Sequence, residues 1–307
     1  MPIFKIEKLK LTPIKEKKID LEKDIQKITE ENIETIFGLK FVSSEFSLHS
    51  FRIDTLAFDE EAKSFVIVEY KRDRSFSVVD QGFAYLSLMV NNKSDFILEF
   101  NEKTNKNLKR EDVDWSQSRV MFLANSFTNY QQNAINFKDL PIELWEIKVF
   151  DNDTIYYNQI KASSNSQESI NKLAKNKEIE NVSREVKKYS IEDHFNKDWT
   201  HTKALFEEMR EKILALDSRI EEVAKKYYIG YKIGFYNICS IHVYKSKLVV
   251  HLVRVEKKDL KDPDNKIEKI PWEQRGWGKL CGYTISKSED IDYAIFLIKQ
   301  VYEKFYK

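Results

Sequence analysis

The stretch Ser64-Phe65-Val66-Ile67-Val68-Glu69-Tyr70-Lys71 decides the fold prediction for the first half of this chain. Residues 65–68 are β-branched or aromatic, which favours a strand, and an unbroken apolar run is typical of a strand buried in the centre of a sheet. The run ends in Glu69 and Lys71, whose side chains share one face because residues two apart on a strand point the same way. Buried charges need partners or a metal, so we expect a polar site at this strand end.

A second strand precedes this one and brings another carboxylate to the same place. Residues 50–58 contain Asp54 within an alternating apolar and polar pattern, and the polar segment 59–63 is typical of a turn. The two strands are therefore expected to form a hairpin, in which Asp54 and Glu69 point into one site. A further strand is expected at 41–46.

This set of side chains suits metal-assisted hydrolysis. Hard cations such as Mg²⁺ prefer oxygen ligands, which Asp54 and Glu69 would supply together with the backbone carbonyl of Tyr70. Lys71 would orient or deprotonate a water for in-line attack on a phosphodiester, and a bound metal lowers the pKa of such a water. The residues alone leave one alternative open, a surface salt bridge of Glu69 with Lys71 or Arg72.

Three segments, taken in order, resemble a known family. They are RIDTLA at 52–57, IVEYKR at 67–72 and DQGFAY at 80–85. These segments are similar to the motifs of the PD-(D/E)xK nuclease superfamily, and above all to its NucS-like branch. The resemblance covers about residues 15–150 and implies a restriction-endonuclease-like core, an α/β fold with a mixed central sheet flanked by helices. The chain departs from the motif at Ile53, where the motif has a proline before the aspartate. That position varies among relatives.

The resemblance also implies a site, residue by residue. The expected catalytic residues are Asp54, Glu69, Lys71, Gln81 on the following helix, and Glu22, or in its place Glu31, on an upstream helix. Mg²⁺ or Mn²⁺ would be the cofactor, held by Asp54, Glu69 and the Tyr70 carbonyl. Nucleic-acid contacts are expected from Arg52, Arg72, Arg74 and Tyr85. For Arg72 and Arg74, a solvated turn is as good an explanation as contacts with phosphates.

Apolar periodicity predicts the other elements of the first half. A helix is expected over 19–37, where Gly38 is a suitable stop, and a second helix over 78–91. Later elements are strands at 119–124, 143–150 and 154–160 and a helix at 130–137. Trp115 is expected to anchor the core rather than to stack on a base.

A polar, Ser/Asn/Lys-rich stretch that begins at residue 161 is typical of a linker. We therefore expect a nuclease-like domain over 1–160, a linker over 161–185 and a smaller α+β domain over 186–307. The last part resembles a C-terminal domain of uncharacterised function that accompanies such nuclease-like modules. Its expected elements are a helix at 202–225, strands at 229–243, 247–255 and 280–286, and a helix at 289–305. Its interleaved aromatic and basic residues suit either a packed core or a base-stacking surface, and the packed core is favoured.

Composition narrows the function classes. The chain has 51 basic and 50 acidic residues in 307, which disfavours a protein that coats DNA through phosphate neutralisation. No G-x-x-x-x-G-K-[ST] or G-x-G-x-x-G loop occurs, so ATP-driven and dinucleotide chemistry are not expected. Cys239 and Cys281 are expected to be buried thiols of a reducing cytoplasm, and His242 and His251 to be structural. Without a signal peptide or an apolar stretch long enough to span a bilayer, a cytoplasmic location and no membrane partner are expected.

The function expected is that of a Mg²⁺- or Mn²⁺-dependent DNA endonuclease acting in repair, restriction or defence. The form of DNA that it would act on is left open, and a homodimer would suit the NucS-like resemblance. Two alternatives remain: a non-catalytic nucleic-acid-binding module that retains the nuclease fold, and a protein-interaction role for the second half.

Overall fold

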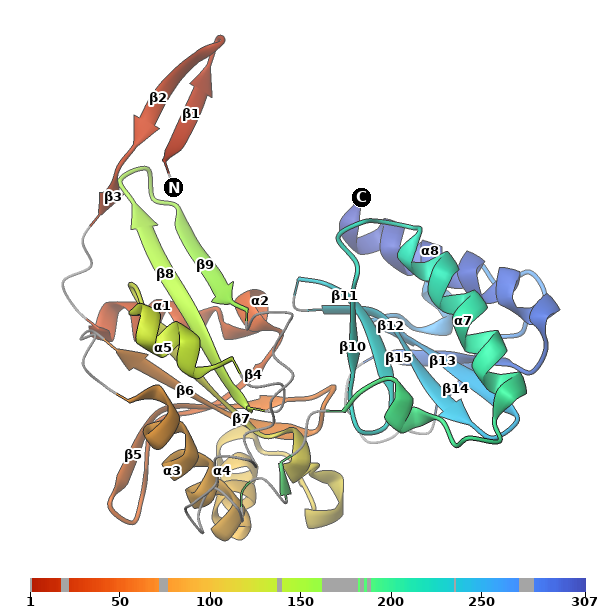
Figure 1. Cartoon of the computed structure of the whole chain (residues 1–307), viewed down its shortest axis with the longest axis horizontal. Coiled ribbons are helices and arrows are strands. Elements are labelled where there is room, and N and C mark those ends of the chain that lie inside the picture. Colours follow the sequence, from red (N-terminus) through yellow and green to blue (C-terminus); the bar gives the residue numbers. More distant parts are fainter. Residues whose placement is uncertain are drawn as a thin grey trace. The chain divides into compact units, whose positions relative to one another are not determined.

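The structure, a computed structural model, describes residues 2–17, 22–71, 77–136, 140–161, 182, 185–186, 189–234, 236–270 and 279–307, with the side chain of Glu22 excepted. Contacts divide the chain into two compact units, Met1–Lys188 and Tyr189–Lys307. The predicted linker at 161–185 lies almost entirely outside the described residues. Each unit has a sheet and helices of its own, with a mixed sheet in unit 1 and an antiparallel sheet in unit 2 (Figure 1).

Unit 1 is built on a mixed sheet with the strand order β3-β8-β7-β6-β5-β4. The strand β9 also belongs to this sheet and pairs with β8 outside this order. Parallel pairs join β6 to β7 and β7 to β8, and the remaining pairs are antiparallel. The strands are β3 (Glu16–Lys17), β4 (Lys40–Leu48), β5 (Phe51–Asp59), β6 (Ser64–Lys71), β7 (Arg119–Ala124), β8 (Ile142–Phe150) and β9 (Ile155–Ile160). The prediction of a mixed central sheet flanked by helices is confirmed.

Helices cover both faces of this sheet. They are α1 (Glu22–Glu31), α2 (Ile33–Phe37), α3 (Val78–Asn91), α4 (Lys93–Thr104) and α5 (Asn129–Ala134). On the face of β6 that carries Phe65, the α4 residue Phe96 packs with its ring centroid 5.7 Å from that of Phe65. On the same face α3 comes so close to β8 that a Cβ on Gly82 would lie 2.3 Å from Ile142 Cδ1. The helix α1 contacts β5 and β6 from the other face, where it meets Tyr70.

The predicted helix at 19–37 is two helices, α1 and α2, with Asn32 between them. The Asn32 side chain donates to the carbonyl of Ile28 at 2.9 Å, and such local side-chain bonds compete with the helical ladder. Gly38 ends α2 in the left-handed region at φ 66°, as its prediction as a stop requires. Trp115 is 9% exposed and stacks on Phe65, which confirms its role in the core.

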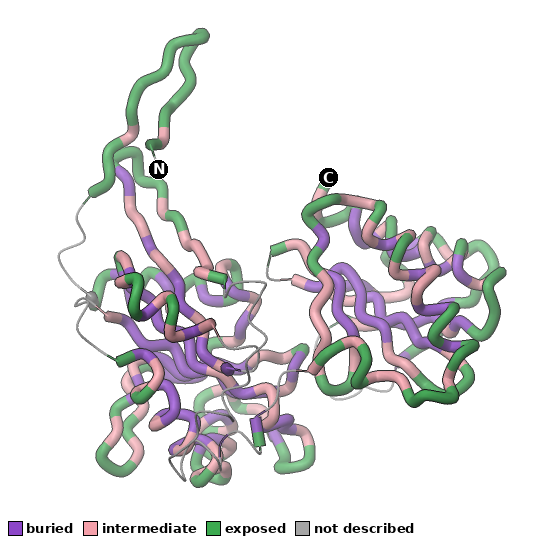
Figure 2. Tube along the Cα trace, in the orientation of Figure 1, coloured by how far each residue is buried: buried purple, intermediate pink, exposed green. Residues whose placement is uncertain are grey.

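A two-stranded hairpin, β1 (Ile3–Glu7) and β2 (Lys10–Ile14), precedes the main sheet. Its residues are mostly exposed, in contrast to the buried strands β5, β6 and β7 (Figure 2). The sequence reasoning did not anticipate this hairpin.

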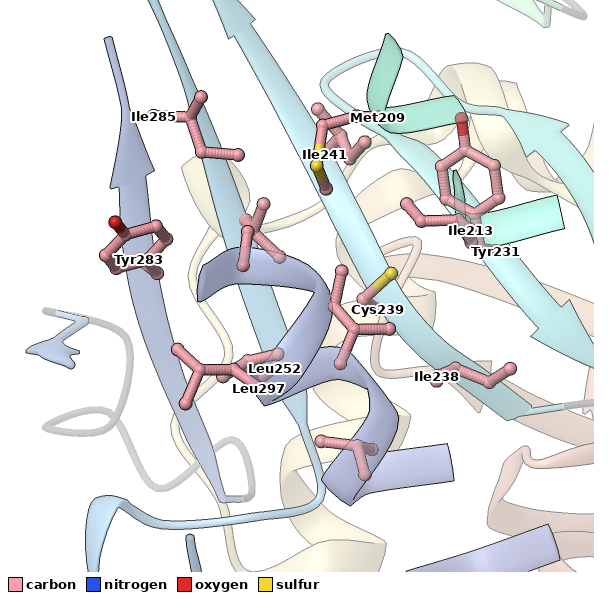
Figure 3. Close-up of a cluster of buried hydrophobic side chains, with 14 of the residues drawn as sticks. Met209, Ile213, Tyr231, Ile238, Cys239, Ile241, Leu252, Tyr283, Ile285 and Leu297 are labelled. Atoms are coloured by element: carbon pink, nitrogen blue, oxygen red, sulfur yellow. The ribbon is translucent and has the colours of Figure 1, made fainter. Parts of the chain in front are cut away.

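Unit 2 is an antiparallel sheet with the order β10-β11-β12-β13-β15-β14. Its strands are β10 (Glu221–Ala224), β11 (Ile229–Ile233), β12 (Tyr236–Tyr244), β13 (Lys247–Val253), β14 (Glu268–Lys269) and β15 (Leu280–Ile285). The helices α7 (Thr200–Leu214) and α8 (Ile291–Tyr306) pack on one face. The core between helices and sheet includes Met209, Ile241, Leu252 and Leu297 (Figure 3). Cys239 and Cys281 are free and buried, as expected.

The predicted helix at 202–225 is wrong from residue 215 onward. The helix ends at Leu214, and residues 221–224 form the edge strand β10. The Asp217 side chain accepts from the Arg219 backbone amide at 2.8 Å, and this turn ends the helical path. Ile220 and Val223 continue the helical spacing by coincidence, and pairing with β11 decides the conformation of β10.

Among the described residues, no helix is long and apolar enough to cross a membrane.

Candidate active site

The two strands of the predicted hairpin separate at Asp54. The ladder between β5 and β6 runs from Asp59–Ser64 to Thr55–Val68 and ends there. On the other side, the β4 register passes from Ser44–Thr55 to Phe46–Ile53 and skips Asp54. The β4 residue at this gap, Glu45, has a left-handed φ of 56°, a conformation that non-glycine residues rarely adopt. The backbone of Asp54 therefore lies in an opening of the sheet.

Side chains replace the missing ladder bonds at this opening. The Asp54 backbone amide donates to Glu69 Oε1 at 3.2 Å, and the Tyr70 backbone amide donates to Asp54 Oδ2 at 2.9 Å. Each carboxylate thus accepts a hydrogen bond from the backbone of the opposite strand. The structure therefore brings Asp54 and Glu69 together, as the hairpin prediction requires.

Lys71 joins the pair from the end of β6. Its Nζ lies 3.1 Å from Glu69 Oε2, and the Lys71 side chain is 20% exposed while that of Glu69 is 2% exposed. The ammonium group therefore contacts the buried carboxylate and still reaches toward solvent. A purely surface salt bridge, the alternative considered from sequence, does not describe this contact, because Glu69 is buried.

The charges of the two carboxylates oppose each other. Burial raises the pKa of Glu69 to about 7, and the negative charge of Asp54 adds to this, while Lys71 acts in the opposite direction. Burial also raises the pKa of Asp54, against the hydrogen bond from the Tyr70 amide. A buried carboxylate and a half-buried one with a single ammonium form a site that gains from additional positive charge.

Tyr85 on α3 faces this site from the helix layer. It is 5% exposed, its hydroxyl donates to the Arg52 carbonyl at 3.4 Å, and burial together with the nearby charge of Glu69 raises its pKa. Gln81 lies one turn earlier on α3, near the Tyr85 hydroxyl, and acts against this rise of the Tyr85 pKa. The expected role of Tyr85 as a nucleic-acid contact is corrected by this burial: the side chain supports Glu69 and presents no open surface for a base.

The predicted basic residues differ in what the structure describes. Arg52 is exposed, shares the Asp54 face of β5 and pairs with Glu45. Arg72 and Arg74 lie outside the described residues. Arg52 therefore lies beside the site, where it could contact a phosphate. The phosphate contacts expected at Arg72 and Arg74 stay predictions.

The upstream helix contributes residues that sequence reasoning missed. Glu22 begins α1, but its side chain lies outside the described residues, and Glu31 is exposed. The carboxylate of α1 that reaches the sheet is Glu30, which accepts from Thr55 Oγ1 at 2.5 Å. Gln26 lies one turn before it and is 8% exposed. Their spacing of four residues on the inner face was the available signal, because such residues are neighbours on a helix.

Asp54 and Glu69 are the described side chains that suit a hard cation here, since carboxylate oxygens are its preferred ligands. The Tyr70 peptide lies between Glu69 and Lys71, and its amide is already bonded to Asp54. Among the described residues, no group of three or more His, Cys, Asp or Glu side chains is arranged to hold a metal. Any site at this place is therefore built from the two carboxylates, with other oxygens completing it.

In unit 2, the aromatic residues and histidines singled out in the sequence belong to the core or to its surface. Tyr231 is buried in the core, while Tyr227 is 61% exposed with Lys226 Nζ 4.9 Å from its ring centroid. The rings of His242 and His251 lie 3.9 Å apart between centroids. Burial lowers the pKa of His242 to about 3 and that of His251 to about 4, as expected for histidines that are part of the structure. The predicted motif at Trp277 and Gly278 lies outside the described residues.

Comparisons with known proteins identify one full-length relative. An uncharacterized protein of Haemophilus influenzae is 42% identical over 302 residues, which cover 98% of this chain and 99% of the relative. No family model matches the chain. Among solved structures, a repair endonuclease from Pyrococcus abyssi is 17% identical, with a TM-score of 0.25 over 43% of this chain and 49% of that chain. A complex of EndoMS with double-stranded DNA is 17% identical, with a TM-score of 0.21 over 37% of this chain and 40% of that chain. TM-scores this low do not by themselves establish a shared fold.

Proposed function

We propose that this chain, which belongs to the same family as the uncharacterized Haemophilus influenzae protein, is a divalent-metal-dependent deoxyribonuclease of the PD-(D/E)xK type. The observation that carries the proposal is the pair of buried Glu69 and half-buried Asp54 with Lys71 beside it. The pair occurs where the sheet opens, and its carboxylates accept hydrogen bonds from backbone amides of the opposite strand.

The residues fit a divalent cation by two criteria. The donor set consists of carboxylate oxygens, which Mg²⁺ and Mn²⁺ prefer. In addition, Glu69 has its pKa raised to about 7 by burial and by the like charge of Asp54, a cost that a bound dication would relieve. Asp54 and Glu69 are the proposed ligands, with the Tyr70 carbonyl as a further oxygen. When bound, the ion would supply Lewis-acid stabilisation of the phosphate and a more acidic water.

The chain's own side chains divide the remaining work. Lys71, which contacts Glu69 at 3.1 Å, is proposed to orient the attacking water and to offset the negative charge that builds on the phosphate. The water oxygen bonds to phosphorus, the bond to the leaving sugar oxygen breaks, and that oxygen takes up a proton. Tyr85 and Gln81 keep Glu69 in place from α3, and Arg52 is proposed to contact a flanking phosphate.

DNA is the proposed substrate because the ordered motifs at 52–57, 67–72 and 80–85 resemble those of a DNA nuclease superfamily. A role in repair, restriction or defence follows from the same resemblance, and both this role and a cytoplasmic location belong to this proposal.

The test compares Asp54→Asn with Glu102→Gln on single-stranded, branched and duplex DNA, in Mn²⁺ and in EDTA. An asparagine at 54 still offers an oxygen to the Tyr70 amide, so the substitution removes charge with little change of shape. Glu102 is an exposed carboxylate of α4 and serves as the matched control. We expect cleavage in Mn²⁺, none in EDTA, and a loss of about 100-fold or more only in Asp54→Asn. Cleavage that persists unchanged in Asp54→Asn would sink the proposal.

The same experiment distinguishes the main alternative, a binding module without catalysis. DNA binding without turnover, unaffected by metal or by Lys71→Ala, would favour that alternative.

A further inference from the structure

A buried polar network lies between α1 and the open part of the sheet. The Gln26 side-chain amide donates to the Asp54 carbonyl at 3.0 Å, and it lies 3.2 Å from Ser44 Oγ and 3.0 Å from Glu30 Oε1. Glu30 also accepts from Thr55 Oγ1, and Thr55 lies 3.4 Å from the Tyr70 hydroxyl. The network therefore touches β4, β5 and β6 around Asp54, on the face opposite to Glu69.

Both backbone polar groups of Asp54 are held by side chains. Its amide donates to Glu69 Oε1 at 3.2 Å and its carbonyl accepts from Gln26 Nε2 at 3.0 Å. The ladders with β4 and β6 skip this residue. Backbone groups in the interior need partners, and a ladder would ordinarily supply them together with a fixed strand geometry. Here Gln26 provides that restraint from a helix.

The position of the Asp54 peptide determines where its carboxylate lies. The Cα of Asp54 sits between the amide bonded to Glu69 and the carbonyl bonded to Gln26, and its Oδ2 accepts from the Tyr70 amide at 2.9 Å. If the carbonyl lost its partner, the peptide could rotate toward another donor and take the carboxylate away from Glu69. Supporting hydrogen bonds of this kind commonly tune metal ligands.

We propose that Gln26 is a positioning residue of this site: its amide holds the Asp54 peptide and thereby sets where the Asp54 carboxylate lies beside Glu69. The effect on metal-dependent cleavage rests on the proposed nuclease function. The effect on the geometry of Asp54 does not, because it concerns hydrogen bonds within the protein alone.

The variant Gln26→Met tests the proposal, because methionine has a similar length and no hydrogen to donate. Thr29→Val is the matched control. Thr29 is on the same helix and is fully buried; it pairs with the Tyr157 hydroxyl at 2.9 Å and lies near the Tyr70 hydroxyl, while the Asp54 peptide is bonded to Gln26 and Glu69. Gln26→Met removes the amide contacts with Asp54, Ser44 and Glu30, whereas Thr29→Val removes one buried hydrogen bond. A merely structural role therefore predicts a larger loss of thermal stability in Gln26→Met, with no selective change at the Tyr70 amide. If Gln26→Met does not fold, Gln26→Asn, which withdraws the amide by one carbon, replaces it.

The primary readout is hydrogen exchange of the Tyr70 amide, which reports on its bond to Asp54 Oδ2 in the absence of metal and DNA. We expect exchange at Tyr70 to become about 10-fold faster in the Gln26 variant than in Thr29→Val, the effect of losing one hydrogen bond. Equal exchange at Tyr70 in the two variants would overturn the assignment.

The second readout is the Mn²⁺ concentration that gives half-maximal cleavage. We expect it to rise about 10-fold in the Gln26 variant, as supporting-residue changes at metal sites do, with the KM for DNA unchanged. If the wild-type protein cleaves no DNA, the proposed function fails, while the Tyr70 exchange still decides the role of Gln26. A Thr29→Val variant that matches Gln26→Met in both readouts would show that Gln26 is only structural.

Discussion

The strands β6 of unit 1 and β13 of unit 2 are interior strands of their sheets, and each buries an ionisable side chain. Glu69 on β6 is 2% exposed and His251 on β13 is 9% exposed. Burial alone lowers the pKa of His251 to about 4, so the imidazole is neutral near pH 7 and tolerates its site. Glu69 has a second carboxylate and an ammonium beside it, and Asp54 adds to the rise of its pKa to about 7. Both strands thus bury an ionisable side chain. The candidate site differs from the core of unit 2 because Glu69 has further charged groups, Asp54 and Lys71, beside it.

The largest expected effect is on the rate of DNA cleavage, which should depend on a lysine of β6 and not on a lysine of β13. Lys71→Met should lower kcat about 100- to 1,000-fold, the usual result of losing one charged group that stabilises a transition state. Lys247→Met is the counterpart at the start of β13, where Lys247 lies over the Tyr244 ring at 5.8 Å. Steady-state cleavage assays should find the Lys247 variant unchanged. Comparable losses in the two variants would show that Lys71 has no special role in catalysis.

A smaller effect is expected on stability, with a sign that depends on pH. The pKa of Glu69 in the folded chain is about 7, against an ordinary value of 4.5, so the folded state binds the proton more tightly. Stability contributed by protonated Glu69 is present at acidic pH and is lost as the pH rises through this window. In EDTA, Glu69→Gln should therefore raise the free energy of unfolding at pH 8 by up to about 3 kcal/mol. Loss of the Lys71 contact offsets part of the gain.

Denaturant unfolding at pH 8 and pH 5 measures this effect. The stabilisation should shrink toward zero at pH 5, since Glu69 is then protonated in the folded wild-type protein. A Glu69→Gln variant that is less stable than wild type at pH 8 would show that the charged cluster stabilises the fold. That result would contradict the expectation that ionised Glu69 destabilises it.

The smallest effect concerns His251 and has the opposite direction. Its folded pKa lies below the ordinary value of 6.5, so the unfolded chain binds more protons as the pH falls from 6.5 toward 4. Stability should decrease over that range, and His251→Gln should remove up to about 2 kcal/mol of the decrease at pH 5. Near pH 7 the variant should show no such gain. Identical pH profiles for wild type and variant would mean that His251 does not titrate in this way.

Local patterns predicted several elements with the bounds that are observed. These elements are the strands at 64–71 and 119–124 and the helix at 78–91. Each has a continuous apolar run or a continuous helical period, so no other secondary structure fits its sequence as well. The helix α4 was not anticipated, because Phe96, Ile97 and Leu98 form a short apolar run that suits a strand as well as a helix. The strand β10 was read as helix, because its conformation depends on a partner, β11, that lies later in the chain.

The candidate site divides in the same way. The pairing of Asp54 with Glu69 and Lys71 followed from a turn and the two-residue period of strands. The inward orientation of Tyr85 and the contact of Gln26 with the Asp54 carbonyl did not follow, since each joins a helix to strands through a side chain whose direction is set by packing. Glu30 was passed over in favour of Glu22 and Glu31 for the same reason.

The amino-acid sequence by itself determined which strands lie in the middle of the first sheet and which charges end them. Those properties arise from neighbours along the chain, where residue spacing dictates the facing of side chains. Only the tertiary structure decided that the sheet opens at Asp54 and that α1 supplies the missing hydrogen bond there. Such contacts join segments tens of residues apart, so they exist only once the helix and the three strands have packed together.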